Sequence, residues 1–411
     1  MLKTIRLRNF KSWHDSGDVE LGALTVLFGP NTAGKSNFID AVLLLSRIAS
    51  ERTLADAFGG PIRGRTIEAF RLGPGGLPAL LQEERVVLGI ESRVATEDEE
   101  LSYRISVALS PRSGELVVDD EYLAALTRKG QPRGNASIER VEDALHVRRK
   151  GKPARPYKMP RGNFSVLSDR RFSGSGYETI ERCRKALTSI RAYYLDPRVA
   201  MRAAQAPEEV SDIGPLGERT AAFLYRIKAH GEGKSFAAIE RTLRTLIPTI
   251  DKLSVDLNAQ RGEVEISIVQ DGIACSSRIV SEGTLRILAL SCMAASPFPA
   301  TLVAFEEPEN GVHPRRIELI ARLLVEMAKK RQQVLVTTHS PVFVGEILRL
   351  VREENAPALL YNVSRVSGAS RIERFSPTGP IFEDAEVRRA LSEPTDGAIV
   401  EAAMVRGLLD G

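Results

Sequence analysis

The sequence predicts an α/β fold built on a mainly parallel, helix-covered sheet, with an antiparallel β subdomain and a helical insertion. Three observations support this class. Continuous apolar strand patterns at 23–28, 301–305 and 332–338 are each followed by a helical pattern, as in a parallel sheet covered by helices. Alternating strand patterns fill residues 85–118. Helical spacing dominates residues 198–257.

Composition sets the protein class. The chain has 411 residues, of which 43% are hydrophobic and 27% charged, as is usual for a soluble globular protein. No apolar run reaches the roughly 18–20 residues that a membrane span needs, and the first ten residues do not look like a signal peptide. Three scattered cysteines indicate free thiols and a cytoplasmic protein. A net charge of +4 means that any nucleic-acid surface must be local.

Residues 29–36 (GPNTAGKS) match the phosphate-loop pattern G-x-x-x-x-G-K-[ST] at every fixed position. The match follows an apolar strand and opens a helix with Phe38, Ala41, Val42 and Leu45 on one face. Such a loop turns backbone N–H groups around an oxyanion at the positive end of a helix. The sequence therefore predicts a nucleoside triphosphate site, in which Lys35 reaches the terminal phosphates and Ser36 contacts Mg²⁺.

Two adjacent carboxylates, Glu306 and Glu307, follow the apolar strand 301–305. Burying one unpaired carboxylate is already costly, so two together require a cation or a shared proton. A Mg²⁺ ion on the phosphates would meet this need, with Glu306 on the metal side and Glu307 as general base for the attacking water. Without the phosphate loop, the same pair would indicate a solvated strand end.

Ser281 and Gly283 lie just before a helix, about twenty residues upstream of the acidic pair. A serine and a tight turn at a helix N-terminus can bind phosphate, although alone they indicate only a helix cap. In the order phosphate loop, serine–glycine turn, acidic strand, they form the signature segment of ABC-type ATPases.

These motifs resemble those of prokaryotic AAA-family ATPases with ABC-type heads, related to the RecF, SMC and OLD-nuclease ATPases. The resemblance is carried by NFKSW (9–13), GPNTAGKSN (29–37), SEGTLRILAL (281–290), FEEPENGVHP (305–314) and TTHSP (337–341). It leaves residues from about 60 to 260 largely unmatched.

The resemblance implies ATP and Mg²⁺ as cofactors and a head-to-tail homodimer, or a higher even-numbered oligomer, closed by ATP. It makes Lys35, Glu307 and His339 catalytic, with His339 sensing the γ-phosphate, and makes Ser36 and Glu306 the metal contacts. Ser281, Glu282 and Gly283 would cap the ATP of the opposite subunit. The ATP-binding residues are Gly29, Pro30, Asn31, Thr32, Ala33, Gly34, Lys35, Ser36 and Asn37.

We expect four segments along the chain. Residues 1–84 and 262–411 form the two halves of the ATPase head, the first with the phosphate loop and the second with the signature, acidic strand and switch histidine. Residues 85–197 form a β-rich part with a basic insertion, and residues 198–261 a helical insertion.

Three roles fit such a switch: a regulatory ATPase of an antiphage defence system that controls a separate nuclease or toxin, a RecF- or SMC-like ATPase that clamps DNA, and a transporter subunit. The layout disfavours the transporter, whose signature follows the phosphate loop at a much shorter interval. About 70 residues follow His339, and they contain no clustered acidic set for a metal nuclease. The defence role is favoured by analogy.

A basic segment could contact DNA, RNA or an acidic partner protein, or could be a solvated hairpin. Between Leu145 and Arg161 it contains seven cations and no acid: Arg148, Arg149, Lys150, Lys152, Arg155, Lys158 and Arg161.

Overall fold

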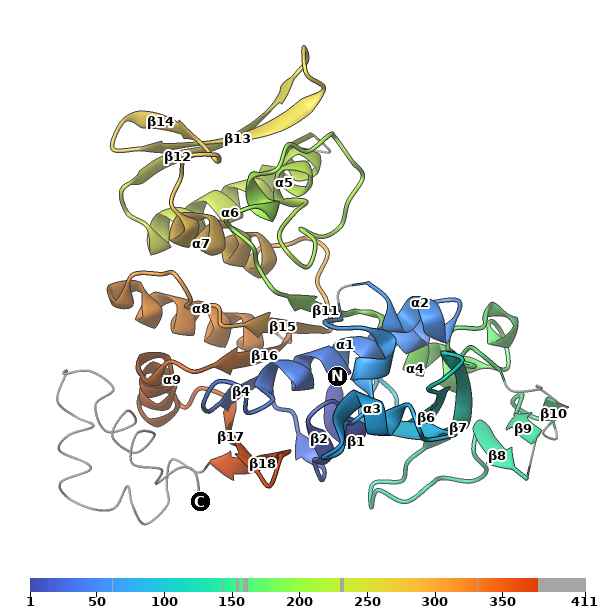
Figure 1. The fold of residues 1–411 in the computed structure, drawn as a ribbon. Coiled ribbons are helices and arrows are strands. Elements are labelled where there is room, and N and C mark those ends of the chain that lie inside the picture. The colour runs from blue at the N-terminus through green and yellow to red at the C-terminus, as the bar shows by residue number, and fades with distance from the viewer. Residues whose placement is uncertain are drawn as a thin grey trace. The chain divides into compact units, whose positions relative to one another are not determined.

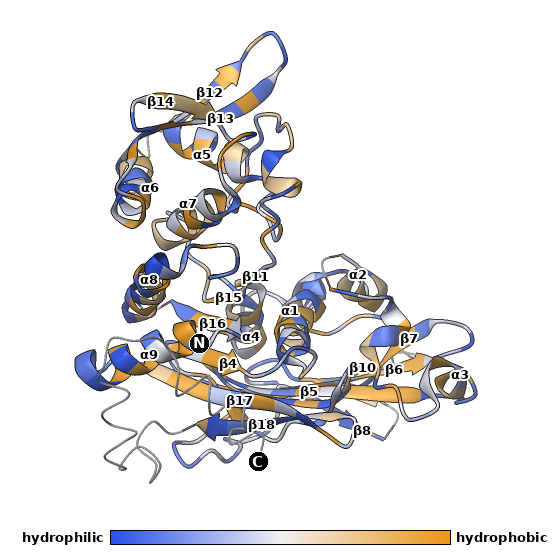
Figure 2. Cartoon of the chain, turned by 60° about the vertical axis from the view of Figure 1, so that its left-hand side comes forward, coloured by the Kyte–Doolittle hydropathy of each residue, from blue (hydrophilic) through white to orange (hydrophobic). Residues whose placement is uncertain are grey.

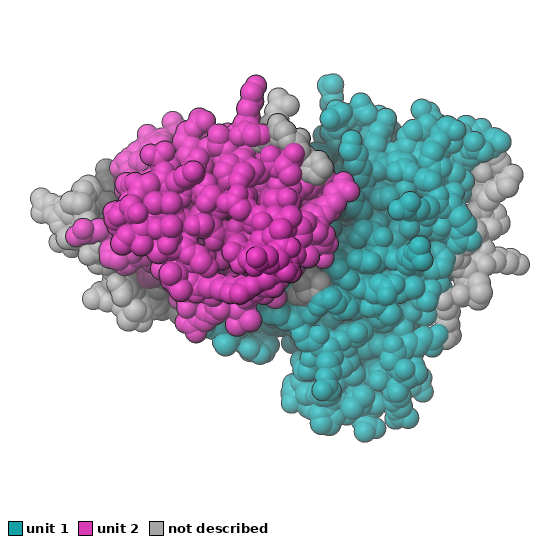
Figure 3. Space-filling model, turned by 90° about the horizontal axis from the view of Figure 1, so that it is seen from above, with its two compact units in different colours: residues 1–22, 29–190, 361–374 teal, residues 23–28, 191–360, 375–411 magenta. Residues whose placement is uncertain are grey.

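The computed structural model describes residues 1–60, 62–142, 144–152, 155–157, 162–229, 233–330 and 332–375, with backbone alone at 155–157. The chain forms two compact units, each assembled from separate stretches of sequence (Figure 3). Unit 1 comprises residues 1–22, 29–190 and 361–374. Unit 2 comprises residues 23–28, 191–360 and 375–411.

Unit 1 contains a nine-stranded sheet with the order β10-β9-β8-β7-β6-β5-β1-β2, and β3 also pairs with β1 (Figure 1). The sequence-predicted strands at 85–118 are confirmed as the long antiparallel neighbours β5 to β7. Their inward side chains alternate with outward ones, as one covered face requires. The strands are β1 (Leu2–Phe10), β2 (Trp13–Asp15), β3 (Val19–Glu20), β5 (Val86–Ala95), β6 (Glu100–Ser110), β7 (Glu115–Ala125), β8 (Ile138–Val141), β9 (Ala144–Val147) and β10 (Arg155–Tyr157).

Helix α1 (Lys35–Ser50) begins inside the phosphate-loop motif, and its predicted apolar face is buried. It packs against α2 (Leu54–Phe58) and α4 (Glu178–Thr188), and the ring of Phe38 meets that of Trp13 edge-on at 5.8 Å. The remaining helical elements of unit 1 are the helix α3 (Gly76–Leu80) and the short 3-10 turns Thr66–Ala69 and Arg170–Phe172.

A buried carboxylate connects β7 to the segment before α4. Glu121 is 0% exposed and accepts hydrogen bonds from Tyr103 Oη at 3.0 Å, Ser165 Oγ at 2.6 Å and the Val166 amide at 2.9 Å. Burial raises the pKa of Glu121, while these hydrogen bonds oppose the rise. The Tyr103 and Ser165 hydroxyls also lie 3.2 Å from each other, so the carboxylate is the centre of a buried hydrogen-bond network.

Unit 2 contains the parallel sheet. Strands β4 (Leu24–Phe28), β15 (Leu302–Glu306) and β16 (Gln333–Thr338) are parallel, with β16 in the middle, and β11 (Ile190–Tyr193) lies next to β15. All five residues of β4 and all six of β16 are buried, as expected of strands covered on both faces. Figure 2 shows hydrophobic residues along the strands of both large sheets. The mainly parallel sheet predicted from the sequence is therefore found here, whereas the largest sheet of the protein is antiparallel.

Helices α7 (Glu282–Ala294), α8 (Ile317–Lys329) and α9 (Pro341–Glu354) alternate with these strands along the chain. The sequence pattern of α8 predicts an apolar face at helical spacing, and all of its residues are buried: Ile317, Ile320, Ala321, Leu324, Val325 and Ala328. Helix α8 packs against α7, α9 and β16. Pro314 lies in a 3-10 turn (Pro314–Arg316) just ahead of α8. The hairpin β17 (Ala358–Val366) and β18 (Ala369–Phe375) leads from unit 2 into unit 1.

Between β11 and α7 lie a 3-10 turn (Ala200–Arg202), α5 (Thr220–Ala229), α6 (Gly233–Leu246) and a three-stranded antiparallel sheet, β12 (Ile250–Asn258), β13 (Glu263–Gln270) and β14 (Ile273–Ser276). The helical pattern predicted up to residue 257 ends earlier than expected, because Ile250, Leu253 and Val255 are buried in β12. This small sheet packs on α5 and α6 and is yellow in Figure 1.

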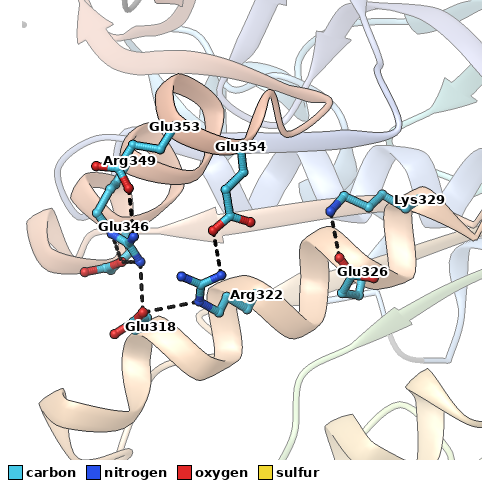
Figure 4. A network of polar contacts seen from close by, with 8 residues as sticks. All are labelled: Glu318, Arg322, Glu326, Lys329, Glu346, Arg349, Glu353 and Glu354. Atoms are coloured by element: carbon cyan, nitrogen blue, oxygen red, sulfur yellow. Dashed lines mark hydrogen bonds and ion pairs between the residues drawn. The ribbon is translucent and has the colours of Figure 1, made fainter.

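Surface ion pairs join α8 to α9 (Figure 4). Arg322 contacts Glu318 at 3.2 Å and Glu354 at 2.6 Å, and Arg349 contacts Glu318 at 2.9 Å. Their side chains are 31–47% exposed, so water and salt screen these contacts and each contributes little to stability. No helix in the described ranges combines the length and apolar character needed to cross a bilayer.

We predict that Glu121→Ala lowers the free energy of unfolding by about 2–4 kcal/mol, because it leaves the buried Val166 amide and one of the two buried hydroxyl donors, on Tyr103 and Ser165, unpaired. The exposed α8–α9 pairs provide the comparison: Arg349→Gln should cost less than about 1 kcal/mol. Urea unfolding of both variants measures the difference. Equal costs would contradict the role given to the Glu121 carboxylate.

Candidate functional site

The phosphate-loop motif forms a tight loop between β4 and α1. Gly29 and Gly34 have φ of 146° and 108°, and Thr32 has a φ of 69°. A Cβ atom on Gly29 would lie 2.1 Å from the Val363 carbonyl oxygen, and one on Gly34 would lie 2.1 Å from Ser370 Oγ. Both the backbone conformation and the close packing therefore require glycine at these two positions.

Lys35 is the first residue of α1 and is only 5% exposed. Its Nζ donates to the carbonyl oxygens of Gly29 and Pro30, at 2.8 Å each. The N-cap residue of α1, Gly34, provides no side-chain cap. A buried ammonium, the Ser36 hydroxyl and the positive end of a 16-residue helix are donors suited to a triphosphate.

Other parts of unit 1 brace this loop. Ser370 Oγ, on β18, donates to the Ala33 carbonyl oxygen at 2.5 Å and lies 2.6 Å from Ser12 Oγ, which accepts a hydrogen bond from Asn37 at 2.8 Å. Lys11 pairs at 2.6 Å with Asp40, which is fully buried on α1. The sequence segment 9–13 therefore supports the loop through Lys11 and Ser12.

In unit 2, three parallel strands end at the same edge of the sheet. In the register, Glu306 is opposite Thr337, Thr337 is opposite Leu27, and Thr338 is opposite Phe28. The phosphate-loop motif begins directly after Phe28 in the chain. The acidic pair, the residues after β16 and the start of the motif thus all follow strand ends at one edge.

Glu307 and His339, singled out from the sequence as base and switch histidine, are in direct contact. His339 Nδ1 lies 2.7 Å from Glu307 Oε1. Glu307 has a φ of 46°, in the left-handed region, and its amide donates to the Thr337 carbonyl oxygen at 2.9 Å. The backbone of the β16 end thus fixes a residue in an uncommon conformation, as often occurs at functional sites.

Glu309 lies next to this pair and was missed by the sequence analysis. It is 6% exposed, and its Oε1 accepts a hydrogen bond from Thr338 Oγ1, which in turn accepts one from the Ser340 amide at 2.9 Å. Its Oε2 is buried and has no hydrogen-bond partner among the described residues. Burial raises the pKa of Glu309 from 4.5 to about 6. Its position three residues after Glu306 was visible in the sequence, but its burial was not.

The signature segment lies at the start of α7, and Ser281 is its N-cap. Ser281 Oγ accepts a hydrogen bond from the Thr284 amide at 3.1 Å, and Glu282 pairs with Arg198 at 2.9 Å. A Cβ atom on Gly283 would lie 2.8 Å from the Gly311 carbonyl oxygen, so this turn packs closely on the loop after the acidic pair. The structure therefore brings the signature and this loop together within one chain.

Arg286, also on α7, was missed by the sequence analysis. Burial lowers its pKa, and the nearby carboxylates of Glu282, Glu309 and Glu307 oppose that shift. A partly buried guanidinium therefore balances the negative charge of the acidic loop.

The basic segment forms no part of the phosphate loop or the acidic edge. Arg148 pairs with Glu139 at 2.7 Å, and Arg149, Lys150 and Lys152 line a separate cavity. Lys158 and Arg161 lie outside the described residues, as does the side chain of Arg155.

No group of three or more histidine, cysteine or acidic side chains in the described part of the chain is arranged to hold a metal by itself. The Ser36 hydroxyl and the Glu306 carboxylate are nevertheless oxygen ligands of the kind that Mg²⁺ takes in addition to phosphate oxygens and water. The donor set therefore fits Mg²⁺ bound together with a nucleotide.

Comparison with known families supports this interpretation. Residues 24–158 and 190–345 match the family described as "AAA domain, putative AbiEii toxin, Type IV TA system". The chain belongs to this family. The resemblance of its motifs to those of ABC-type ATPases of the RecF, SMC and OLD kind is thereby confirmed.

Similarity to curated proteins is local. An OLD nuclease of Thermus scotoductus is 38% identical over 76 residues, which are 17% of this chain and 14% of that protein. A DNA replication and repair protein RecF of Trichormus variabilis is 42% identical over 55 residues, which are 13% of this chain and 15% of that protein. The matches thus span only a small part of these relatives.

Similarity of fold extends over most of the chain. An SMC head bound to the C-winged helix domain of ScpA has a TM-score of 0.56 at 16% identity, covering 91% of this chain and 98% of that one. An SMC head of Pyrococcus furiosus with an extended coiled coil has a TM-score of 0.51 at 13% identity, covering 95% and 99%. The predicted fold class, an ABC-type ATPase head, is confirmed.

We predict a pH-dependent stability difference between Glu309→Gln and the unmodified protein. Because folding raises this pKa, the neutral Glu309 carboxyl stabilises the fold below about pH 4.5, and that contribution is lost as the pH rises through about 6. The variant should therefore gain about 2 kcal/mol relative to the unmodified protein between pH 4.5 and 7.5. Urea unfolding across this range tests it, and a difference that stays constant with pH would contradict it.

Proposed function

We propose that this protein is an ATP-dependent switch that binds Mg²⁺-ATP at the phosphate loop and hydrolyses it as a head-to-tail dimer. The observation that carries this proposal is the common edge at which β4, β16 and β15 end. In that register Glu306 ends β15, and the phosphate-loop motif, Glu307 and His339 follow directly after the ends of β4, β15 and β16 in the chain. This supports the proposal, because ligands of open α/β sheets bind at such strand ends.

In this proposal, Lys35 and the backbone of residues 29–37 bind the phosphates. Mg²⁺, held by Ser36 and Glu306, would neutralise phosphate charge. Glu307 accepts the proton of the attacking water through Oε2, because Oε1 already contacts His339. His339 orients Glu307 and responds to the γ-phosphate, and Glu309 holds the end of β16 from which His339 projects.

The signature segment supports a dimer. Ser281, Glu282 and Gly283 would bind the ATP of the partner subunit, with the N-terminus of α7 directed at its γ-phosphate. Two identical heads related by a two-fold axis would then each complete the other's site. ATP binding closes such a dimer, and hydrolysis removes the phosphate that both subunits hold. A higher even-numbered oligomer could be built from the same dimer.

We propose that this switch regulates a separate effector, a nuclease or toxin, in an antiphage defence system. Support comes from the description of the family, which names a toxin of a toxin–antitoxin system, and from the local similarity to an OLD nuclease. A second candidate is an ATPase that clamps DNA in repair or replication, which the local similarity to RecF favours. Stimulation of ATP turnover by DNA would favour the second candidate, and stimulation by a co-purified effector would favour the first.

We predict that Glu307→Gln keeps ATP binding, slows turnover by about 10²–10⁴-fold and accumulates a closed dimer, because the amide cannot accept the proton from water. Phosphate release measures turnover, and light scattering with and without ATP measures the dimer. Glu326→Gln, on the exposed side of α8, removes a similar charge and should change neither quantity. A strict monomer in both states would contradict the dimer, and unchanged turnover would contradict the role of Glu307.

We predict that Lys35→Ala abolishes detectable ATP binding without unfolding the chain, because it removes the only side-chain cation of the phosphate-loop motif (29–36). Calorimetric titration with ATP and Mg²⁺ measures binding, and circular dichroism reports the fold. Lys252→Ala, which removes an exposed cation on β12, should bind ATP normally. Full ATP affinity in Lys35→Ala would place the nucleotide elsewhere.

A further inference from the structure

A cavity of about 380 Å³ lies in unit 1 and shares no residue with the phosphate loop or the acidic edge. Five separate segments line it: Glu99, Ala125, residues 133–137, residues 148–152 and residues 176–182. Its volume lies within the range of small-ligand sites. Residues far apart in the sequence therefore converge on one partly open cavity, which a simple solvated hairpin would not produce.

The charge of this cavity is strongly positive. Its lining contains two carboxylates, Glu99 and Glu178, and six cations: Arg133, Arg148, Arg149, Lys150, Lys152 and Arg182. Three of these cations are already neutralised by ion pairs, since Arg133 and Arg182 contact Glu99, and Arg148 contacts Glu139.

The other three cations, Arg149, Lys150 and Lys152, form no ion pair with any residue that the structure describes. They sit on one turn, which is anchored where the Lys150 amide donates to the Gly176 carbonyl oxygen at 2.8 Å. Arg149 packs so closely on Gly176 that a Cβ there would lie 2.7 Å from Arg149 Cγ. The turn that carries these three cations is thus anchored beside Gly176.

A glycine-containing loop and a helix N-terminus lie beside these cations. Gly174 and Gly176 have φ of 79° and 99°, and α4 begins directly afterwards at Glu178. The N-cap residue, Tyr177, makes no side-chain cap. The end of this loop and the first turn of the 11-residue helix line the cavity through Gly176, Tyr177, Glu178 and Thr179, so the positive end of α4 lies at its wall.

One carboxylate, that of Glu178, already lies among these positively charged groups. Glu178 Oε1 accepts a hydrogen bond from the Gly176 amide at 3.2 Å. Hydrogen bonds from its own amide and from that of Gly176 lower the pKa of Glu178, and Lys150 and Arg182 lower it further. An internal anion is therefore stabilised at the position where an external anion would bind.

We propose that this cavity binds phosphate groups, either those of a free nucleotide or those of a nucleic-acid strand, as a second ligand site of the protein. Arg149, Lys150 and Lys152 supply the charge, and the Gly176 amide, now bonded to Glu178, supplies a backbone donor. Glu178 competes with the ligand for the same donors. Neutralising Glu178 should therefore strengthen binding, while removing the lysines should weaken it.

The test uses the full chain carrying Lys35→Ala, so that ATP turnover and binding at the phosphate loop do not enter the measurement. Three probes are titrated: pyrophosphate, adenosine monophosphate and a fluorescent 20-nucleotide single strand. The double variant Lys150→Ala/Lys152→Ala should bind at least about tenfold more weakly, since each phosphate contact to a cation is a charge-assisted hydrogen bond. Glu178→Gln should bind several-fold more tightly. Lys129→Ala, an exposed cation on a neighbouring turn that does not line the cavity, is the matched control.

Binding of the small probes would identify a free nucleotide as the ligand. Binding of the strand alone, with an affinity that falls steeply with salt, would identify a nucleic acid. The proposal is overturned if no probe binds, or if the double variant binds as well as Lys129→Ala. It is also overturned if Glu178→Gln fails to increase affinity, because the ligand would then lie outside the cavity.

Discussion

The site depends first on the parallel register of β4, β16 and β15. These strands are mostly apolar and buried, and their charged residue, Glu306, comes only where β15 ends. Because parallel strands end at the same edge, the register places Glu306, Thr337 and Leu27 at one level. The same register that packs the apolar core of the sheet therefore also determines where the charged groups lie. A shift of β15 by one residue would move Glu306 and Glu307 out of line and turn their side chains to opposite faces.

Much of this arrangement could be predicted from the sequence, because it depends on local patterns. The phosphate-loop motif, the buried strands and the apolar face of α8 are short-range signals. The partners of the loop could not be predicted in this way. Ser370 contacts Ala33 although 337 positions separate them, and no local pattern encodes that contact. The helical pattern failed near Ile250 for a similar reason, since burial against neighbouring elements determines β12. The basic segment could be recognised in the sequence. The cavity could not be predicted, because it also depends on Glu99 and Glu178, which lie outside that segment.

Two buried glutamates show how the surroundings decide what a carboxyl group does. Glu121 has three hydrogen-bond donors and connects the interior of unit 1. Glu309 Oε1 accepts one hydrogen bond, whereas Oε2 accepts none from the described residues. The first arrangement stabilises the fold, because every polar atom has a partner. The second leaves an unsatisfied oxygen beside Glu307 and His339, and incompletely satisfied groups of this kind are concentrated at functional sites.

The hydrogen bond from Ser370 to the phosphate loop also determines the order of assembly. Residues 29–36 are synthesised before the hydroxyl group that braces Ala33 and packs against Gly34, because Ser370 lies 337 positions after Ala33. A nascent polypeptide therefore carries the nucleotide motif without this brace until residue 370 has been made. A product that terminates before residue 370 has the motif but not the support, so completion of the loop depends on synthesis of the distant β17–β18 hairpin.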